Sequence, residues 1–161
     1  IEMPAAGNVT EVGAVWSHLS VAGFLTGSYS GDPADEAAYR NTSVADGEVP
    51  ANAFQGPILL GHFDYYVDGP LATQGSVTRL AYSFGGNIPV PLLRDLDQKL
   101  DDGVAGTGVL RSAMGAATAP TTLFGAVVGY ENTEECLADI STIANWNVDS
   151  ANPDCNAIFL Y

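Results

Sequence analysis

Few residues of this chain have the types and spacing that catalysis requires. The pentapeptide GSYSG at residues 27–31 has the glycine spacing of a nucleophile elbow, but Tyr29 occupies the central position where a serine nucleophile would stand. We interpret it as a glycine-flanked turn. The glycine-rich stretch at residues 103–108 follows a predicted helix instead of preceding one, so it lacks the helix N-terminus that would hold a phosphate group.

The two histidines, His18 and His62, lie in no metal-binding or catalytic pattern. Neither belongs to an HExxH sequence, and no cysteine stands at a spacing suited to zinc. We expect each to be a hydrogen-bonded structural residue. A hydrolase built on Ser17 and His18 is disfavoured, because adjacent residues on a helix point about 100° apart. The sequence therefore predicts a protein that is not an enzyme, with no catalytic residues and no cofactor.

Acidic residues gather near position 100: Asp95, Asp97, Asp101 and Asp102. Calcium prefers several carboxylate oxygens, but this spacing does not match an EF-hand loop, and a helical period spreads the side chains around the axis. We therefore predict a solvated helix end and no metal. Acids at a helix C-terminus oppose the helix dipole, so Asp101 and Asp102 need loop amides, a cation or another chain to compensate them. Whether a calcium ion binds near these two residues stays open.

Cys136 and Cys155 are the only cysteines. Their separation alone is compatible with a disulfide, with two buried thiols or with half of a metal site. We assign them to a disulfide that closes a C-terminal loop. Such a bridge would stabilise the protein by roughly 3 kcal/mol through loop entropy.

Composition and charge limit the possible partners. The 161 residues include 19 Asp and Glu against five Lys and Arg, for a formal charge of −14, and 47% of the residues are hydrophobic. We therefore predict one folded domain over residues 1–161 that binds neither nucleic acid nor anionic lipid heads. The longest apolar stretch, residues 57–67, is interrupted by His62 and Asp64, so no membrane span is predicted. Any export signal or anchor is expected to lie outside this sequence.

Two helices are predicted. In the first, over residues 8–24, Val12, Val15, Trp16 and Leu19 recur at helical spacing, and Gly23 or Gly27 can end it. Trp16 then needs another surface to cover it.

The second predicted helix covers residues 89–102. Pro91 suits its first turn, Gly103 suits its C-terminal end, and the expected buried stripe is Leu92, Leu93, Leu96 and Leu100.

Strands are predicted over residues 58–67 and 76–84, which alternate as half-buried antiparallel partners. In the first, Leu59, Phe63, Tyr65 and Val67 should share one face and His62, Asp64 and Tyr66 the other. In the second, Leu80, Tyr82 and Phe84 should point inward, and Arg79 and Ser83 outward.

Further strands are expected over 121–130 and 157–161, with a turn or two of helix over 134–144. Residues 26–54 are predicted to form a long surface loop with one helical turn at 34–39.

Two segments resemble a known family. Residues 11–31, EVGAVWSHLSVAGFLTGSYSG, resemble the W-x-H-L-x-x-A-G-(aliphatic)-x-G-x-Y-x-G stretch of bacterial type IV pilin-like and pseudopilin proteins. Residues 96–108, LDQKLDDGVAGTG, are similar to their D-x-K-(aliphatic)-D-D-G-x-x-x-(T/S)-G segment. Cys136 and Cys155 also stand where such proteins often carry a C-terminal disulfide loop. The leader, the peptidase site and the hydrophobic helix that define the family are not in this sequence.

The resemblance implies an α+β fold in which an N-terminal helix packs on an antiparallel sheet of about four strands, with residues 26–54 as the loop between them. Trp16 and Leu19 would anchor the helix on the sheet. The implied function is a structural subunit of a type IV pilus or type II secretion pseudopilus. The implied partners are other pilin or pseudopilin subunits, and the membrane would be reached only through the missing N-terminal helix. The implied location is the bacterial cell envelope, in a periplasmic or extracellular filament.

An alternative interpretation is a secreted or surface module that binds carbohydrate or protein. Tyr29, Tyr39, Tyr65 and Tyr66 would then form an exposed stacking surface. Aromatic side chains buried beneath the first helix would favour the filament subunit instead.

Overall fold

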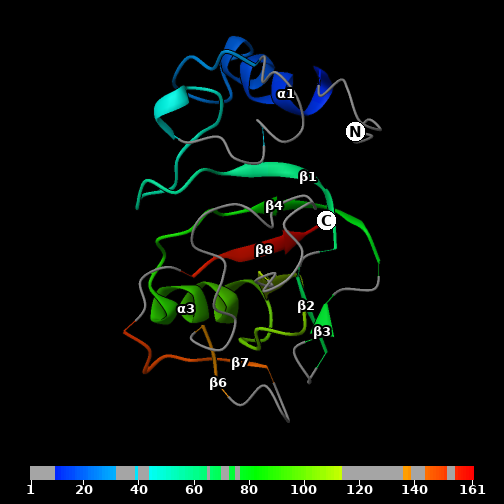
Figure 1. The fold of residues 1–161 in the computed structure, drawn as a ribbon, viewed down its shortest axis with the longest axis vertical. Coiled ribbons are helices and arrows are strands. Elements are labelled where there is room, and N and C mark those ends of the chain that lie inside the picture. The colour runs from blue at the N-terminus through cyan, green and yellow to red at the C-terminus, as the bar shows by residue number, and fades with distance from the viewer. Residues whose placement is uncertain are drawn as a thin grey trace.

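Four antiparallel strands form the central sheet in the computed structural model of the protein (Figure 1). The structure describes residues 10–31, 39, 44–64, 66–69, 73–74, 77–113, 136–138, 144–151 and 155–161. The strands lie in the order β1-β4-β8-β5, so the last strand in the sequence lies inside the sheet. Their bounds are β1 (Leu59–Phe63), β4 (Arg79–Ser83), β5 (Leu110–Ser112) and β8 (Ala157–Leu160). The predicted α+β class, the four-stranded antiparallel sheet, and the pairing of the strands near residues 60 and 80 are confirmed.

Both faces of the sheet are covered. Successive side chains of a strand point to opposite faces, and β8 is a continuous apolar run. Ile158 and Leu160 belong to one core cluster, which also contains Trp16, whereas Ala157 and Phe159 belong to a second cluster, which contains Leu93. The sheet is therefore a layer inside the core, unlike the half-buried sheet predicted from alternation.

This double coverage overturns part of the predicted facing of two strands, although Leu59 and Val67 are buried and Arg79 is exposed as predicted. Ser83, expected to face solvent, is completely buried, and a hydrogen bond of 2.8 Å from Asn156 Nδ2 satisfies its hydroxyl there. Ala81 is also buried, whereas Leu80 and Tyr82 are only half-buried. Tyr66, also expected on the solvent side, is buried.

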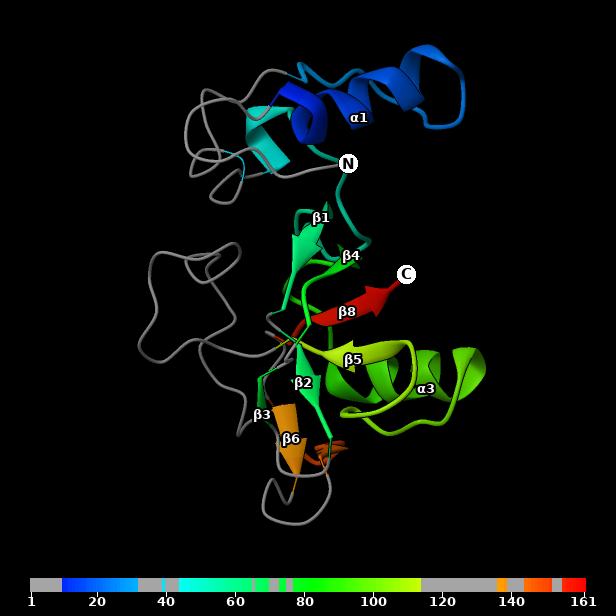
Figure 2. The same cartoon turned by 90° about the vertical axis from the view of Figure 1, so that its right-hand side faces the viewer.

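The helix α1 (Thr10–Val21) ends where the glycine pattern predicts. Gly23 has a positive φ of 80°, its N–H donates to the Ser20 carbonyl, and the Phe24 N–H donates to the Leu19 carbonyl. These two bonds form a Schellman motif. The end of the helix is exposed to solvent, including Phe24 and Val21. Figures 1 and 2 show α1 beyond β1, at the edge of the sheet.

The helix α3 (Val90–Leu100) lies beside β5 and β8 (Figure 2). Pro91 falls in its first turn and Gly103, just beyond its end, has a positive φ of 76°, as the sequence predicts. Its buried stripe, however, consists of Val90, Leu93 and Asp97. Leu93 is buried as predicted and Leu96 is half-buried, but Leu92 and Leu100 are 47% and 46% exposed, so the predicted stripe was wrong at these two positions.

Two pairs of short strands and one 3-10 turn complete the described fold. The predicted strand over residues 58–67 is divided, because β1 ends at Phe63 and Val67 begins a separate hairpin of β2 (Val67–Asp68) and β3 (Thr73–Gln74). Within 134–144, expected to be helical, the structure has the strand β6 (Leu137–Ala138), which pairs with β7 (Asn145–Trp146). A 3-10 turn, η1 (Val44–Asp46), lies in the long loop before β1.

Some predicted elements cannot be compared with the structure. The strand predicted over residues 121–130 lies outside the described residues, as does the turn predicted at 34–39 except for Tyr39. Among the helices that the structure describes, none has the length and apolar character needed to cross a membrane.

Candidate functional site

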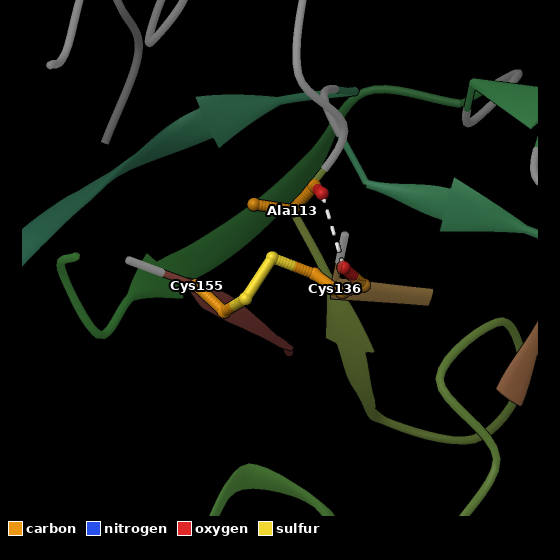
Figure 3. The surroundings of a disulfide bond; sticks show 4 residues. Ala113, Cys136 and Cys155 are labelled. Atoms are coloured by element: carbon orange, nitrogen blue, oxygen red, sulfur yellow. Dashed lines mark hydrogen bonds between the residues drawn. A yellow bond between two sulfur atoms is a disulfide. The ribbon is translucent and has the colours of Figure 1, made fainter. Parts of the chain in front are cut away.

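The predicted disulfide joins Cys136 to Cys155, with 5.8 Å between their Cα atoms (Figure 3). Both residues are buried. The Asn147 N–H donates to the Cys136 carbonyl, and the Ile88 N–H donates to the Cys155 carbonyl. Ile88 lies just before α3, so the bridge and these bonds hold the β6–β7 hairpin close to the start of that helix. The assignment of the two cysteines is confirmed.

A buried hydroxyl links α1 to the edge strand β1. Trp16 Nε1 donates to Tyr39 Oη at 3.2 Å, and Tyr39 Oη donates to the Leu60 carbonyl and accepts from the Leu60 N–H, each at 3.1 Å. The hydroxyl therefore uses both backbone groups that Leu60 turns away from the sheet. Burial raises the pKa of Tyr39 to about 12, although the hydrogen bonds to Leu60 and Trp16 oppose that rise.

The two predicted anchor residues lie in the core cluster on this side of the sheet. Trp16 is 4% exposed, and Leu19 is half-buried and packs against the same cluster. The burial of Tyr39 and Tyr66, each 1% exposed, removes both from the proposed carbohydrate-stacking surface. Tyr66 Oη donates to the Val77 carbonyl, and the Arg111 guanidinium lies over the Tyr66 ring. Tyr29 is half-buried and Tyr65 is outside the described residues.

The acidic cluster is not the solvated helix end that we predicted. Asp97 is completely buried, and its Oδ2 accepts a 2.6 Å hydrogen bond from Trp146 Nε1 of β7. Oxygen atoms of Asp97, Asp101 and Asp102 all lie within 4.8 Å of one another. The sequence pattern around Asp97 gave no signal of this burial.

Loop amides compensate Asp101 and Asp102, which is one of the three arrangements that the sequence left open. Asp101 accepts N–H bonds from Asp102, Val109 and Leu110. Asp102 accepts from the Val104 N–H at 2.9 Å and the Thr107 hydroxyl at 2.6 Å. Gly108 has a positive φ of 71°, and a Cβ there would collide with the Asp101 carboxylate. The segment after α3 thus folds around these two side chains.

The pKa values of the Asp97 and Asp101 carboxyl groups are shifted in opposite directions. Burial raises the pKa of Asp97 to about 7, with a hydrogen bond to Asp101 and the charges of Asp101 and Asp102 adding to the rise. Burial alone would raise the pKa of Asp101 as well, but the hydrogen bond from Asp97 and the three loop amides lower it below its ordinary value. Asp101 therefore loses its proton at a lower pH than Asp97 does.

An apolar groove of about 190 Å³ lies between the loop before β1 and one side of α3. Asn52 is the one polar residue among those that line it, and the others are Ala53, Phe54, Ile58, Phe84, Ile88, Leu92, Leu93 and Leu96. Phe54 and Leu92 are exposed at its surface.

The amide of Asn52 is occupied by the fold itself. Its Nδ2 donates to the carbonyls of Phe84 and Gly86, and its Oδ1 accepts from the N–H groups of Phe54 and Gly56. The groove can therefore shelter apolar surface, but it presents no free polar group from Asn52 to a ligand.

The remaining candidates from the sequence are the GSYSG segment and the two histidines. The GSYSG segment runs back along α1, where a Cβ on Gly31 would approach Ser17 Cβ to 2.8 Å. His18 is exposed. His62 of β1 lies opposite Leu80, and its buried Nδ1 has no hydrogen-bond partner among the described residues, contrary to the expectation for this histidine.

Comparison with protein-family models, with curated proteins and with solved structures found no match for this chain.

Proposed function

We propose that this chain is the globular domain of a type IV pilin-like or pseudopilin subunit, a non-catalytic component of a bacterial envelope filament. The observation that carries the proposal is the Cys136–Cys155 disulfide, which closes a C-terminal loop beside an antiparallel sheet. The resemblance implies such a loop in this part of the chain.

The residues that carry the resemblance support the proposal through their structural roles. In the first segment, Trp16 is buried and hydrogen-bonded, and Gly31 allows a close approach to α1. In the second, Asp101 accepts three loop amides and Gly108 leaves room for its carboxylate. Motif residues that serve the fold in this way are typical of a structural subunit, whose function depends on its shape.

The proposal includes an anchoring role for Trp16 and Leu19. The chain of hydrogen bonds from Trp16 through Tyr39 to Leu60 supports the attachment of α1 to β1. In an assembled filament, this link would transmit load from the N-terminal part of the chain to the sheet.

The groove beside α3 is our candidate for lateral contact with a neighbouring subunit. Its lining is apolar, and the one polar side chain in it is already paired. The charge of −14 disfavours nucleic acid as a partner and favours basic patches on adjacent subunits. This function requires no cofactor.

Electron microscopy of cells that produce the chain with its own upstream sequence tests the proposal. Gold-conjugated antibodies against the folded domain should label filaments sheared from the cells along their length. Recovery of the chain only as a free monomer, beside unlabelled filaments, would show that it is not a filament subunit.

A matched pair of variants tests the groove separately. Leu92 and Leu100 are on the same helix and are almost equally exposed, but only Leu92 lines the groove. We expect Leu92→Glu to reduce the amount of chain in the sheared filament fraction at least about tenfold, because a charge cannot be buried unpaired in an apolar contact. Leu100→Glu should assemble normally. Equal assembly of both variants would place the lateral contact elsewhere.

A further inference from the structure

One oxygen atom of the acidic cluster lacks a hydrogen-bond donor among the described residues. Asp97 is completely buried, and its Oδ2 is bonded to Trp146, but no hydrogen-bond donor among the described residues reaches its Oδ1. A buried carboxylate oxygen without a donor is costly, so something must satisfy it. The adjacent Asp101 side chain is an acceptor, so a proton or a cation between the two carboxyl groups would satisfy both of them.

The surrounding hydrogen bonds favour a proton. Asp101 Oδ2 already accepts two N–H groups and Oδ1 accepts a third, while each oxygen of Asp102 also has a donor. Calcium requires six to eight oxygen ligands, and this cluster has few lone pairs left to offer. A single proton on Asp97 satisfies the unpaired oxygen with no further ligand.

We propose that Asp97 and Asp101 share one proton, carried on Asp97 Oδ1 and donated to the Asp101 carboxylate, and that this proton locks the end of α3 to β7 in a pH-dependent way. The lock has three connected parts. Trp146 of β7 holds one oxygen of Asp97, the proton joins the other oxygen to Asp101, and the loop amides hold Asp101. This proposal does not depend on assembly into a filament.

The two charged groups that act directly on Asp97 act in the same direction. Asp101 and Asp102 face it from the loop after α3, and both disfavour a second negative charge. The described residues of β7, Asn145 and Trp146, are not titratable. On β5, the Arg111 guanidinium is bonded to Asp68 and to the Gly108 carbonyl. The charged side chains of α3 itself, Arg94, Asp95 and Lys99, are exposed to solvent.

Loss of the proton leaves two adjacent carboxylates and no donor between them. The pKa of Asp97 is about 7 in the folded protein and about 4 in an unfolded chain, so the folded state holds the proton more tightly. The stabilisation is complete below about pH 4 and is lost as the pH rises through about 7. The attachment of β7 to the end of α3 should therefore weaken in mildly alkaline solution. The disulfide-closed hairpin, which contains β7, should become less firmly held as a result.

Thermal unfolding of the whole chain at several pH values tests the lock. Between pH 5 and pH 8.5, we expect the unfolding temperature to fall by roughly 5–10 °C. In Asp97→Asn, the side-chain amide can accept from Trp146 and donate to Asp101 at every pH, so most of this fall should disappear. Asp95→Asn, on the exposed face of the same helix, should keep the wild-type pH dependence.

A direct titration keeps the proposal testable if Asp97→Asn does not fold. In NMR spectra of the wild-type chain, the Asp97 carboxyl carbon and the Trp146 indole N–H should shift together with a midpoint near pH 7. Titration of Asp97 below pH 5 would overturn the proposal. An unfolding temperature that rises on addition of millimolar CaCl₂ in the wild type, but not in Asp97→Asn, would also overturn it and assign the cluster to a cation.

Discussion

A single phenolic oxygen, Tyr39 Oη, satisfies three groups that would otherwise be unpaired in the core. Tyr39→Phe should lower the free energy of unfolding by about 1–3 kcal/mol, because it leaves the Trp16 indole N–H and two backbone groups of Leu60 buried without partners. Urea unfolding measures the loss. Tyr29→Phe is the matched control, since its hydroxyl donates to the Thr26 carbonyl at an exposed position, and it should cost less than about 0.5 kcal/mol. Equal losses in the two variants would contradict the role of Tyr39.

The sequence predicted the surroundings of some residues and not those of others. Helical spacing correctly predicted a buried Trp16, and the dipole argument predicted that Asp101 needs compensation. The burial of Asp97 was missed, because its partner Trp146 stands 49 residues further along the chain in a segment without a clear pattern. The role of Tyr39 was missed for the same reason. A buried polar group is specified by a distant partner, and local periodicity contains no information about that partner.

At the scale of elements, the turn before β1 packs closely against the segment that follows β4, and glycines stand at the contact. Gly56 has an ordinary φ, but a Cβ there would collide with the Gly86 carbonyl and lie 2.7 Å from Asn52 Nδ2. Gly56→Ala should therefore destabilise the protein by about 2 kcal/mol or more through steric overlap. Gly23→Ala has open space but a φ of 80°, so it should cost only about 1 kcal/mol. Chemical denaturation compares the two, and a smaller loss in Gly56→Ala than in Gly23→Ala would contradict the close packing.

The element boundaries show what sequence patterns capture. Both helices and the pairing of β1 with β4 were predictable, because glycine ends the helices and turn residues separate the strands. The buried face of α3 was not. Four leucines suggested the stripe, but the helix turns Asp97 and Val90 to the core and leaves Leu92 in the groove. The two-residue strands β6 and β7 are too short to produce any period.

At the scale of the molecule, the disulfide closes a loop that includes β6 and β7. Reducing it should lower the free energy of unfolding by about 3 kcal/mol, because the unfolded chain gains the freedom that the closed loop lacked. Urea unfolding of the oxidised chain and of the reduced and alkylated chain measures this difference. Alkylation without reductant is the control and should add no mass, since neither cysteine is free. Two reactive thiols in the native chain would contradict the bridge.

The place of β8 between β4 and β5 has a consequence for synthesis on the ribosome. The other three strands are complete by residue 112, but among the described strands β5 pairs only with β8, and β4 has only β1 until residues 157–160 arrive. A nascent chain therefore exposes an unsatisfied hairpin edge until β8 has been translated, and such edges invite aggregation. Folding of this protein should depend on a chaperone, or on rapid release, during that interval.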